Sequence, residues 1–277
     1  MADYESSRSD APNDALKQIP GAEPASRIDA MWWLVLGVIV LVVFLIVVFP
    51  DPYFNLVKFV TDGIVITVTV TVGSFIFVLF AGLVGGLGRL AKNKIINTIA
   101  TLYVELIRGI PLLVQLIWWY FAFPVVIQGI GRALKIDALV SYQANPIAMA
   151  IIGLVFCYGA YMSEIYRAGI QSIPKGQMEA ARSLGMTYFQ AMRYVILPQA
   201  IRVILPPVGN EFIALLKDSS LVSVVAVTDL TRRSREYMST HFNPIEVWTM
   251  AALLYLIMTL LSARVVNHIE RKTKFER

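Results

Sequence analysis

One amide and three charged side chains stand in a largely apolar stretch, residues 204–227: Asn210, Glu211, Lys217 and Asp218. A buried charge is costly unless it is paired, so such groups usually face one another or a polar ligand. Two carboxylates and one ammonium can bind a ligand that carries both signs of charge. Lys217 and Asp218 can equally neutralise each other, and the residue types alone leave both interpretations open.

Residue types that usually perform catalysis are scarce. The chain has one cysteine, Cys157, and two histidines, His241 and His268, which are far apart in sequence. Neighbours in sequence therefore form no metal-ligand cluster and no nucleophile–histidine pair, and no Gly-x4-Gly-Lys-Ser/Thr motif for nucleotide phosphates occurs. We expect no catalytic residue and no metal site, and we expect Cys157 to be buried as a small apolar side chain.

The composition is that of a membrane protein. Of 277 residues, 57% are hydrophobic and 16% are charged, and the mean hydropathy is +0.66. Soluble domains average about 45–50% apolar and about 25% charged residues. The apolar residues also gather into runs near the roughly 18 residues that can span a bilayer. The net charge of +5 is interpreted as a topology signal, and we expect no nucleic-acid binding.

Hydropathy predicts an all-α, polytopic membrane protein with about six transmembrane helices. The run at 63–87 is rich in β-branched residues, but a strand is rarely longer than about 10 residues, so a helix is favoured. Pro206 and Pro207 interrupt the run at 204–227, and such a break requires surrounding protein or a polar cavity. The predicted spans are 31–49, 63–87, 102–124, 147–166, 204–227 and 245–266.

Basic residues are distributed unevenly between the two sides of this arrangement. With the amino terminus in the cytoplasm, the inner segments, to which Arg108 is assigned, hold 17 of the 24 basic residues. This is the asymmetry of the positive-inside rule, so we expect a multi-pass protein with both termini cytoplasmic. The seven outer residues are Lys58, Arg132, Lys135, Lys217, Arg232, Arg233 and Arg235.

The chain divides into four parts. Residues 1–30 are polar and have too few apolar side chains to fold, which predicts a disordered cytoplasmic tail. Residues 31–50 predict an extra amino-terminal transmembrane helix, because a signal peptide would begin with a basic region and not with a long polar segment. Residues 61–268 form the transmembrane domain, and residues 269–277 form a cytoplasmic carboxy-terminal tail.

Two short spacings within the domain predict helix contacts. Gly82 and Gly86 are four residues apart, which allows a close approach of a second helix. Glu164 and Arg167 are three apart and can pair on one helical face. Such a pair either supports the structure or takes part in gating.

The polar segment 174–198 lies between two apolar runs and carries its own folding signals. Pro174 separates it from the preceding span, and 177–184 consists of good helix formers. Gly185 suits the left-handed position that ends a helix. Glu179 places a negative charge near the amino end of this helix, where the helix dipole favours it.

Thr187 and Gln190 begin the second half of this segment. Their spacing predicts a capping box that starts another helix, which Pro198 interrupts. A helix, a glycine turn and a second helix predict a compact docking surface on the cytoplasmic side.

The same segment resembles the EAA signature of ABC-importer permeases. Glu179-Ala180-Ala181 is followed after three residues by Gly185 and, after nine more, by Val195, where isoleucine is usual, one further residue and Leu-Pro. Over roughly residues 60–270, further blocks resemble the polar-amino-acid branch of that family: Arg108-Gly-Ile-Pro111-Leu-Leu-Val-Gln115, Tyr161-Met-Ser-Glu164-Ile-Tyr-Arg167, Pro198-Gln-Ala, Gly209-Asn-Glu211 and Lys217-Asp-Ser-Ser-Leu. Ile110 and Ser219 depart from that branch, which usually has threonine.

The resemblance implies the type I ABC-importer transmembrane fold and a set of partners. A separate ABC ATPase dimer would bind ATP and magnesium and hydrolyse the ATP, so this chain would be no enzyme and hold no cofactor. A second permease subunit, identical or similar, would complete the pathway, and an extracytoplasmic solute-binding protein would deliver the substrate. The residues implied to couple to the ATPase are Glu179, Ala180, Ala181, Leu184 and Gly185.

We therefore interpret the chain as an importer permease for a polar amino acid of the glutamate/glutamine, aspartate or basic class, in the bacterial cytoplasmic (inner) membrane. Asn210, Glu211, Lys217 and Asp218 are the candidate residues along the substrate path. The alternative is a secondary amino acid transporter driven by an ion gradient, which would ordinarily have matching broken helices in both halves. A membrane-embedded enzyme would need a clustered nucleophile or metal site.

Overall fold

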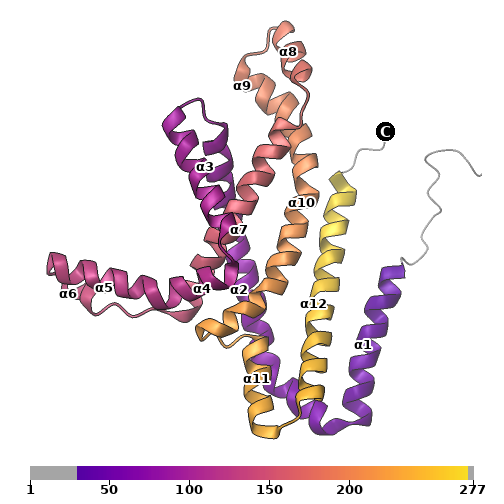
Figure 1. Ribbon diagram of the computed structural model, residues 1–277. Coiled ribbons are helices and arrows are strands. Elements are labelled where there is room, and N and C mark those ends of the chain that lie inside the picture. Colours follow the sequence, from indigo (N-terminus) through magenta and orange to yellow (C-terminus); the bar gives the residue numbers. More distant parts are fainter. Residues whose placement is uncertain (1–29, 274–277) are drawn as a thin grey trace, which may run out of the picture.

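The computed structural model of the chain describes residues 30–273, and every regular element in that range is a helix (Figure 1). This confirms the predicted all-α fold. Of the tail predicted at 1–30, residues 1–29 lie outside the described part, as do the last residues, 274–277. Four described helices are long and apolar enough to cross a membrane: α2 (Pro50–Leu90), the run Leu112–Leu134, α7 (Pro146–Gln171) and α12 (Pro244–Thr273).

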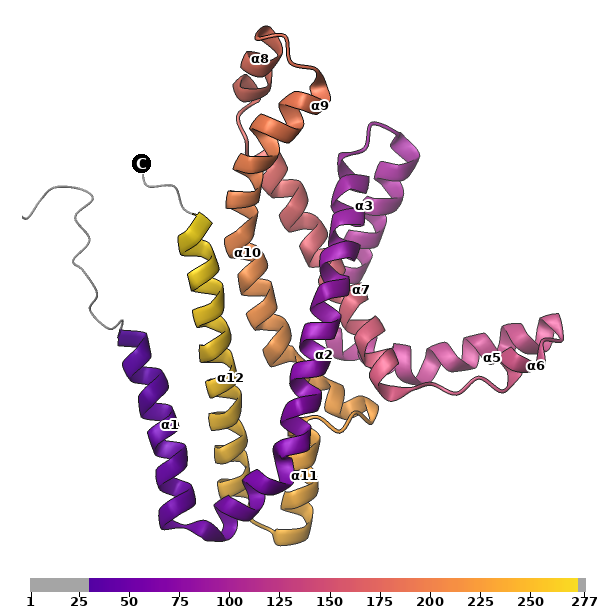
Figure 2. The same cartoon turned by 180° about the vertical axis from the view of Figure 1, so that it is seen from behind.

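The longest helix, α2, packs along α7 over much of its length (Figure 2). Glycines allow this approach: a Cβ on Gly82 would lie 2.4 Å from Cγ of Met162, and a Cβ on Gly86 would lie 3.0 Å from the carbonyl oxygen of Ser163. The close helix contact predicted from Gly82 and Gly86 is confirmed. It forms part of the main apolar core, together with Val78 and Leu154.

The single predicted span at 102–124 is wrong. The chain bends at Ile110, whose backbone is extended (φ −104°, ψ 129°), because the residue before a proline is disfavoured in the α region and Pro111 has no N–H to donate. In both views α5 and α6 then leave the bundle (Figures 1 and 2). The elements are α3 (Lys94–Gly109), α4 (Leu112–Ile117), a π-helical turn (Trp118–Ala122), α5 (Phe123–Leu134) and α6 (Asp137–Val140).

The predicted interruptions at prolines are also wrong, because the chain stays helical from α9 through α10. Pro198 closely follows a wider π turn, and a local π adjustment of this kind lets a helix accommodate the loss of the N–H that proline lacks. Pro206 and Pro207 lie inside α10. The elements here are α8 (Lys175–Ser183), α9 (Tyr188–Ala191), the π turn (Met192–Ile196), α10 (Leu197–Asp218), a 3-10 turn (Ser219–Val225) and α11 (Leu230–His241).

The extra amino-terminal helix α1 (Ala30–Val48) lies beside α12 and contacts α2 (Figures 1 and 2). Val35 and Val42 are its buried residues, and Val42 joins a second apolar cluster with Leu56 and Met250. At the other end, α12 continues to Thr273. Part of the predicted tail at 269–277 is therefore helical.

Candidate functional site

The segment predicted as a docking surface forms one tip of the molecule, with α8 and α9 beside each other (Figure 1). Gly185 has φ +83°, as predicted for the residue after a helix end. Its N–H donates to the carbonyl of Arg182 (3.0 Å), and the N–H of Met186 donates to that of Ala181 (3.2 Å). These two bonds make the Schellman motif, which satisfies the last carbonyls of α8.

The predicted capping box at the start of α9 is confirmed. The N–H of Gln190 donates to Oγ1 of Thr187 (3.3 Å), and the N–H of Thr187 donates to Oε1 of Gln190 (2.8 Å). The turn between the two helices is thus fixed on both sides. It presents Leu184, Tyr188 and Phe189 at 81%, 60% and 70% exposure.

The five predicted coupling residues divide by burial. Glu179, Ala180, Leu184 and Gly185 are exposed, whereas Ala181 is buried. The expected dipole role of Glu179 is wrong, because α8 begins at Lys175 and its first turn holds no acidic residue. Glu179 lies in the second turn, where the effect of the helix dipole has already fallen off.

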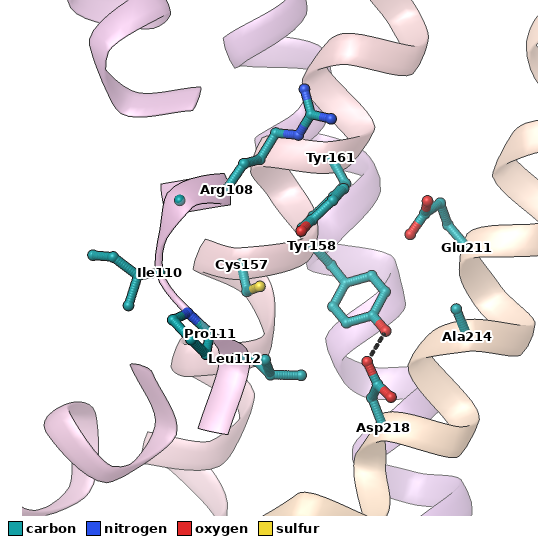
Figure 3. A pocket seen from close by; sticks show the side chains of 11 residues that line it. Arg108, Ile110, Pro111, Leu112, Cys157, Tyr158, Tyr161, Glu211, Ala214 and Asp218 are labelled. Atoms are coloured by element: carbon teal, nitrogen blue, oxygen red, sulfur yellow. Dashed lines mark hydrogen bonds between the residues drawn. The ribbon is translucent and has the colours of Figure 1, made fainter. Parts of the chain in front are cut away.

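A cavity of about 450 Å³ lies between α3, α4, α7 and α10 (Figure 3). Arg108 at the end of α3 borders it on one side, and Glu211 and Asp218 of α10 border it on the other (Figure 3). Tyr158 and Tyr161 of α7 lie between them. The remaining lining residues are Gly109, Ile110, Pro111, Leu112, Cys157 and Ala214.

Aromatic side chains hold two of the charged groups. The hydroxyl of Tyr158 donates a hydrogen bond of 2.7 Å to Oδ2 of Asp218. The guanidinium of Arg108 lies over the ring of Tyr161, 5.1 Å from its centroid. Glu211 shares its face of α10 with Asp218 because the two are seven residues apart, about two helical turns. The cavity therefore presents a cation on one wall and two carboxylic acids on another.

Only two of the four predicted path residues, Glu211 and Asp218, line this cavity. Asn210 and Lys217 are exposed on another face of α10, since each precedes a lining residue and successive helical positions are rotated by about 100°. The alternative pairing of Lys217 with Asp218 is not what the structure has, because Asp218 is held by Tyr158.

Three cavity residues were missed as site residues: Arg108, Tyr158 and Tyr161. Arg108 was assigned to an inner segment, although it lies only three residues before Pro111 in an apolar run. Tyr158 and Tyr161 are three apart, which places two hydroxyls on one helical face. That spacing is the signal in the sequence from which Tyr158 and Tyr161 could have been predicted. The predicted burial of Cys157 is confirmed.

An ion cluster lies one turn beyond Tyr161 on α7. Glu164 accepts hydrogen bonds from Arg167, at 2.9 Å from Nε, and from Arg89 of α2. The pairing of Glu164 with Arg167 predicted from their spacing is confirmed. Arg89 extends it, so that the cluster joins α2 to α7. Glu105 of α3 also lies near the cluster, with its carboxylate 3.7 Å from the guanidinium of Arg89.

Comparison with known proteins agrees with this arrangement. The family described as binding-protein-dependent transport system inner membrane component matches residues 78–275. The glutamine transport system permease protein GlnP of Escherichia coli (strain K12) is 36% identical over 213 residues, which are 77% of this chain and 92% of GlnP. The L-cystine transport system permease protein TcyB of Bacillus subtilis (strain 168) is 38% identical, over 76% of this chain and 85% of TcyB.

A solved structure of an amino acid ABC transporter is similar in both sequence and shape. It is 37% identical with a TM-score of 0.69, over 78% of this chain and 94% of that one. The chain therefore belongs to the family of binding-protein-dependent transport system inner membrane components. The predicted resemblance to amino-acid importer permeases is confirmed, and the secondary-transporter alternative is not favoured.

Proposed function

We propose that this chain is the permease subunit of an ATP-driven importer and that its cavity lies on the route of a polar amino acid across the cytoplasmic membrane. The cavity's charge pattern carries the proposal, with Arg108 facing the carboxylic acids of Glu211 and Asp218. A free amino acid has one carboxylate and one ammonium, so it matches this pattern. A volume of about 450 Å³ lies within the range of small-molecule sites, roughly 300–1,000 Å³.

The part of the substrate that the cavity binds is the head group common to all amino acids. Arg108 is assigned to the α-carboxylate, since a guanidinium presents paired donors to a carboxylate. Glu211 and Asp218 are assigned to the α-ammonium. GlnP and TcyB are named for glutamine and L-cystine, whose side chains differ while their head groups are the same. Side-chain selection then belongs to the solute-binding protein.

The tip formed by α8 and α9 is the surface for the ATPase subunits. Leu184, Tyr188 and Phe189 are exposed there on a turn whose backbone is fixed by local hydrogen bonds. A rigid apolar surface of this kind is suited to burial in a partner. We assign ATP and magnesium to an ATPase dimer on this side, and both termini of the permease to the cytoplasm.

The open side of the cavity supports the presence of a further subunit. Arg108 and Ile110 are exposed in the single chain, so a substrate here needs a further wall. A second permease subunit, identical or similar, supplies that wall. An extracytoplasmic solute-binding protein delivers the amino acid to the face opposite α8.

Uptake by the reconstituted importer tests the cavity. Arg108→Met and Glu211→Gln each remove one charged contact to substrate, so each should raise the substrate half-saturation concentration by about tenfold or more, given roughly 1.5–3 kcal/mol for a charged hydrogen bond. Lys217→Met is the matched control, because it removes a charge from another face of α10. Unchanged half-saturation in both cavity variants, with normal assembly, would overturn the assignment.

A further inference from the structure

Gln115 is a buried polar residue that lines no part of the cavity. It lies on α4 and is 5% exposed. Its amide nitrogen donates to the carbonyl oxygens of Ile107 (2.9 Å) and Ile110 (2.8 Å). Both carbonyls belong to the bend between α3 and α4. A single side chain therefore uses both of its amide protons on the backbone of one turn.

The bend removes the helical N–H donors that these two carbonyls would otherwise have. Pro111 has no N–H, and the extended backbone of Ile110 stops the helical ladder at the end of α3. Carbonyls near a helix end have no partner within the helix. At membrane depth no bulk water replaces that partner, so an unbonded carbonyl is costly. From four residues beyond Pro111, Gln115 supplies a donor to the Ile110 carbonyl and a second donor to the Ile107 carbonyl, which also accepts from the N–H of Ile110 (3.3 Å).

The bend that Gln115 holds is one wall of the cavity. Arg108, Gly109, Ile110, Pro111 and Leu112 follow one another along the chain, and all of them line the cavity. Ile107 and Ile110, which accept from Gln115, bracket Arg108. The hydrogen bonds from Gln115 therefore fix the backbone on both sides of Arg108, and the fixed backbone sets the direction of the Arg108 side chain.

We infer that Gln115 is a positioning residue for the substrate cavity: its amide fixes the bend at 107–111 so that Arg108 faces Glu211. The inference rests on the proposed function of the cavity, but the claim about the bend stands on the two hydrogen bonds. Gln115 does not touch substrate and acts through Arg108.

The test uses the complete reconstituted importer with Gln115→Met and Gln115→Asn. Methionine matches glutamine in length but donates nothing, and asparagine keeps the amide but is one methylene too short to reach both carbonyls. Gln128→Met is the matched control, because Gln128 donates to a single carbonyl, that of Tyr142 (2.9 Å), in the projecting α5 segment. Labelled glutamine, L-cystine and arginine are offered, and the amino acid that the wild type takes up is followed.

Two measurements separate positioning from general stability. The first is the substrate half-saturation concentration, which should rise about tenfold in both Gln115 variants, corresponding to about 1.4 kcal/mol, with maximal uptake changed much less. The second is the rate at which a methanethiosulfonate reagent labels Leu112→Cys, in a chain whose single native cysteine is replaced by Cys157→Ala. Leu112 follows the bend, lines the cavity and is half-buried, so a loosened bend should speed the labelling several-fold.

Comparison with Arg108→Met separates the possible failures. If the double variant Arg108→Met, Gln115→Met binds substrate no more weakly than Arg108→Met alone, the two residues act through one contact, as inferred. If both Gln115 variants leave the half-saturation concentration and the Leu112→Cys labelling rate at the Gln128→Met values while Arg108→Met weakens substrate binding, the inference is overturned and the proposed function stands. If Arg108→Met has no effect but the Gln115 variants speed labelling, the bend is as described and the proposed function falls.

Discussion

Replacement of Gly185 by alanine or valine isolates the turn between α8 and α9. A Cβ at this position meets no atom within 4 Å, so a substitution there adds no clash, but the backbone has φ +83°. An L-residue in the left-handed region costs roughly 1–2 kcal/mol, and a β-branched residue there is a strong outlier. Alanine should therefore lower the equilibrium constant for the correct turn by roughly fivefold to thirtyfold, and valine by more.

Gly176 provides the matched control for this prediction. It also has open space around its Cβ position, but it lies inside α8 and is not among the residues with positive φ. Gly176→Ala adds the same methyl group and should preserve or stabilise the helix, because alanine is the better helix former. The comparison varies the backbone conformation alone.

Binding-protein-stimulated ATP hydrolysis by the reconstituted complex is the assay. Activity should fall in the order Gly176→Ala, Gly185→Ala, Gly185→Val, while the amount of permease in the membrane stays constant. Full stimulated hydrolysis and uptake with Gly185→Val would show that the geometry of this turn does not transmit the signal, and the coupling role assigned to α8 would be refuted.

Three further predictions concern topology, the amino-terminal segment and the ion cluster. A phosphatase fusion in the turn at Phe242, between α11 and α12, should be active and one after the last residue inactive; the reverse pattern would contradict cytoplasmic termini. Deletion of residues 2–29 should leave uptake within about twofold of wild type, since this polar segment has too few apolar side chains to fold; loss of ATPase binding would reveal a docking role. Glu164→Gln should lower thermal stability in detergent by about 1–3 kcal/mol, because Arg89 and Arg167 lose a charged acceptor, whereas Glu105→Gln, whose carboxylate is more exposed and lies 3.7 Å from Arg89, should change it by less than about 1 kcal/mol.

The docking segment was predictable because its folding signals are local. The left-handed conformation of Gly185 and the Thr187–Gln190 capping box depend on residues within one or two turns. Hydropathy likewise identified the long apolar helices, since length and composition suffice for that. The predicted helix begins at residue 177, whereas α8 begins at Lys175. Glu179 was therefore predicted in the first turn, although it lies in the second.

The bend at Pro111 was not predicted, because the residues on both sides of it are similarly apolar and a hydropathy window averages over them. The cavity was predicted only in part for a different reason. Its walls come from three stretches far apart in sequence, which include Arg108, Tyr158 and Glu211. The four residues predicted from the sequence lie within one span, and hydropathy alone does not divide a span into its faces. Helical periodicity would have separated Glu211 and Asp218 from Asn210 and Lys217.

Two helices join the cavity to the docking segment: α7, which ends just before α8, and α10, which continues from α9 through the π turn. Tyr158 and Tyr161 stand on α7 at the cavity, Glu164 binds Arg89 one turn further on, and α8 follows directly after the end of α7 at Gln171. The spacing between α2 and α7 leaves little room for sliding, because a single methyl group at Gly82 would already overlap Met162. Close-packed interiors transmit displacement rather than absorb it.

We expect a displacement of the docking segment to move α7 together with α2, and to move α10 through α9. The tyrosines on α7 hold Arg108 and Asp218. Those two residues belong to α3 and α10, which contact α7 less extensively than α2 does. The movable boundary is thus the cavity itself, where the α2–α7 pair meets α3 and α10. We expect such a displacement to change the distance between Arg108 and the two carboxylic acids, so that an amino acid held between them would be released when that distance no longer fits.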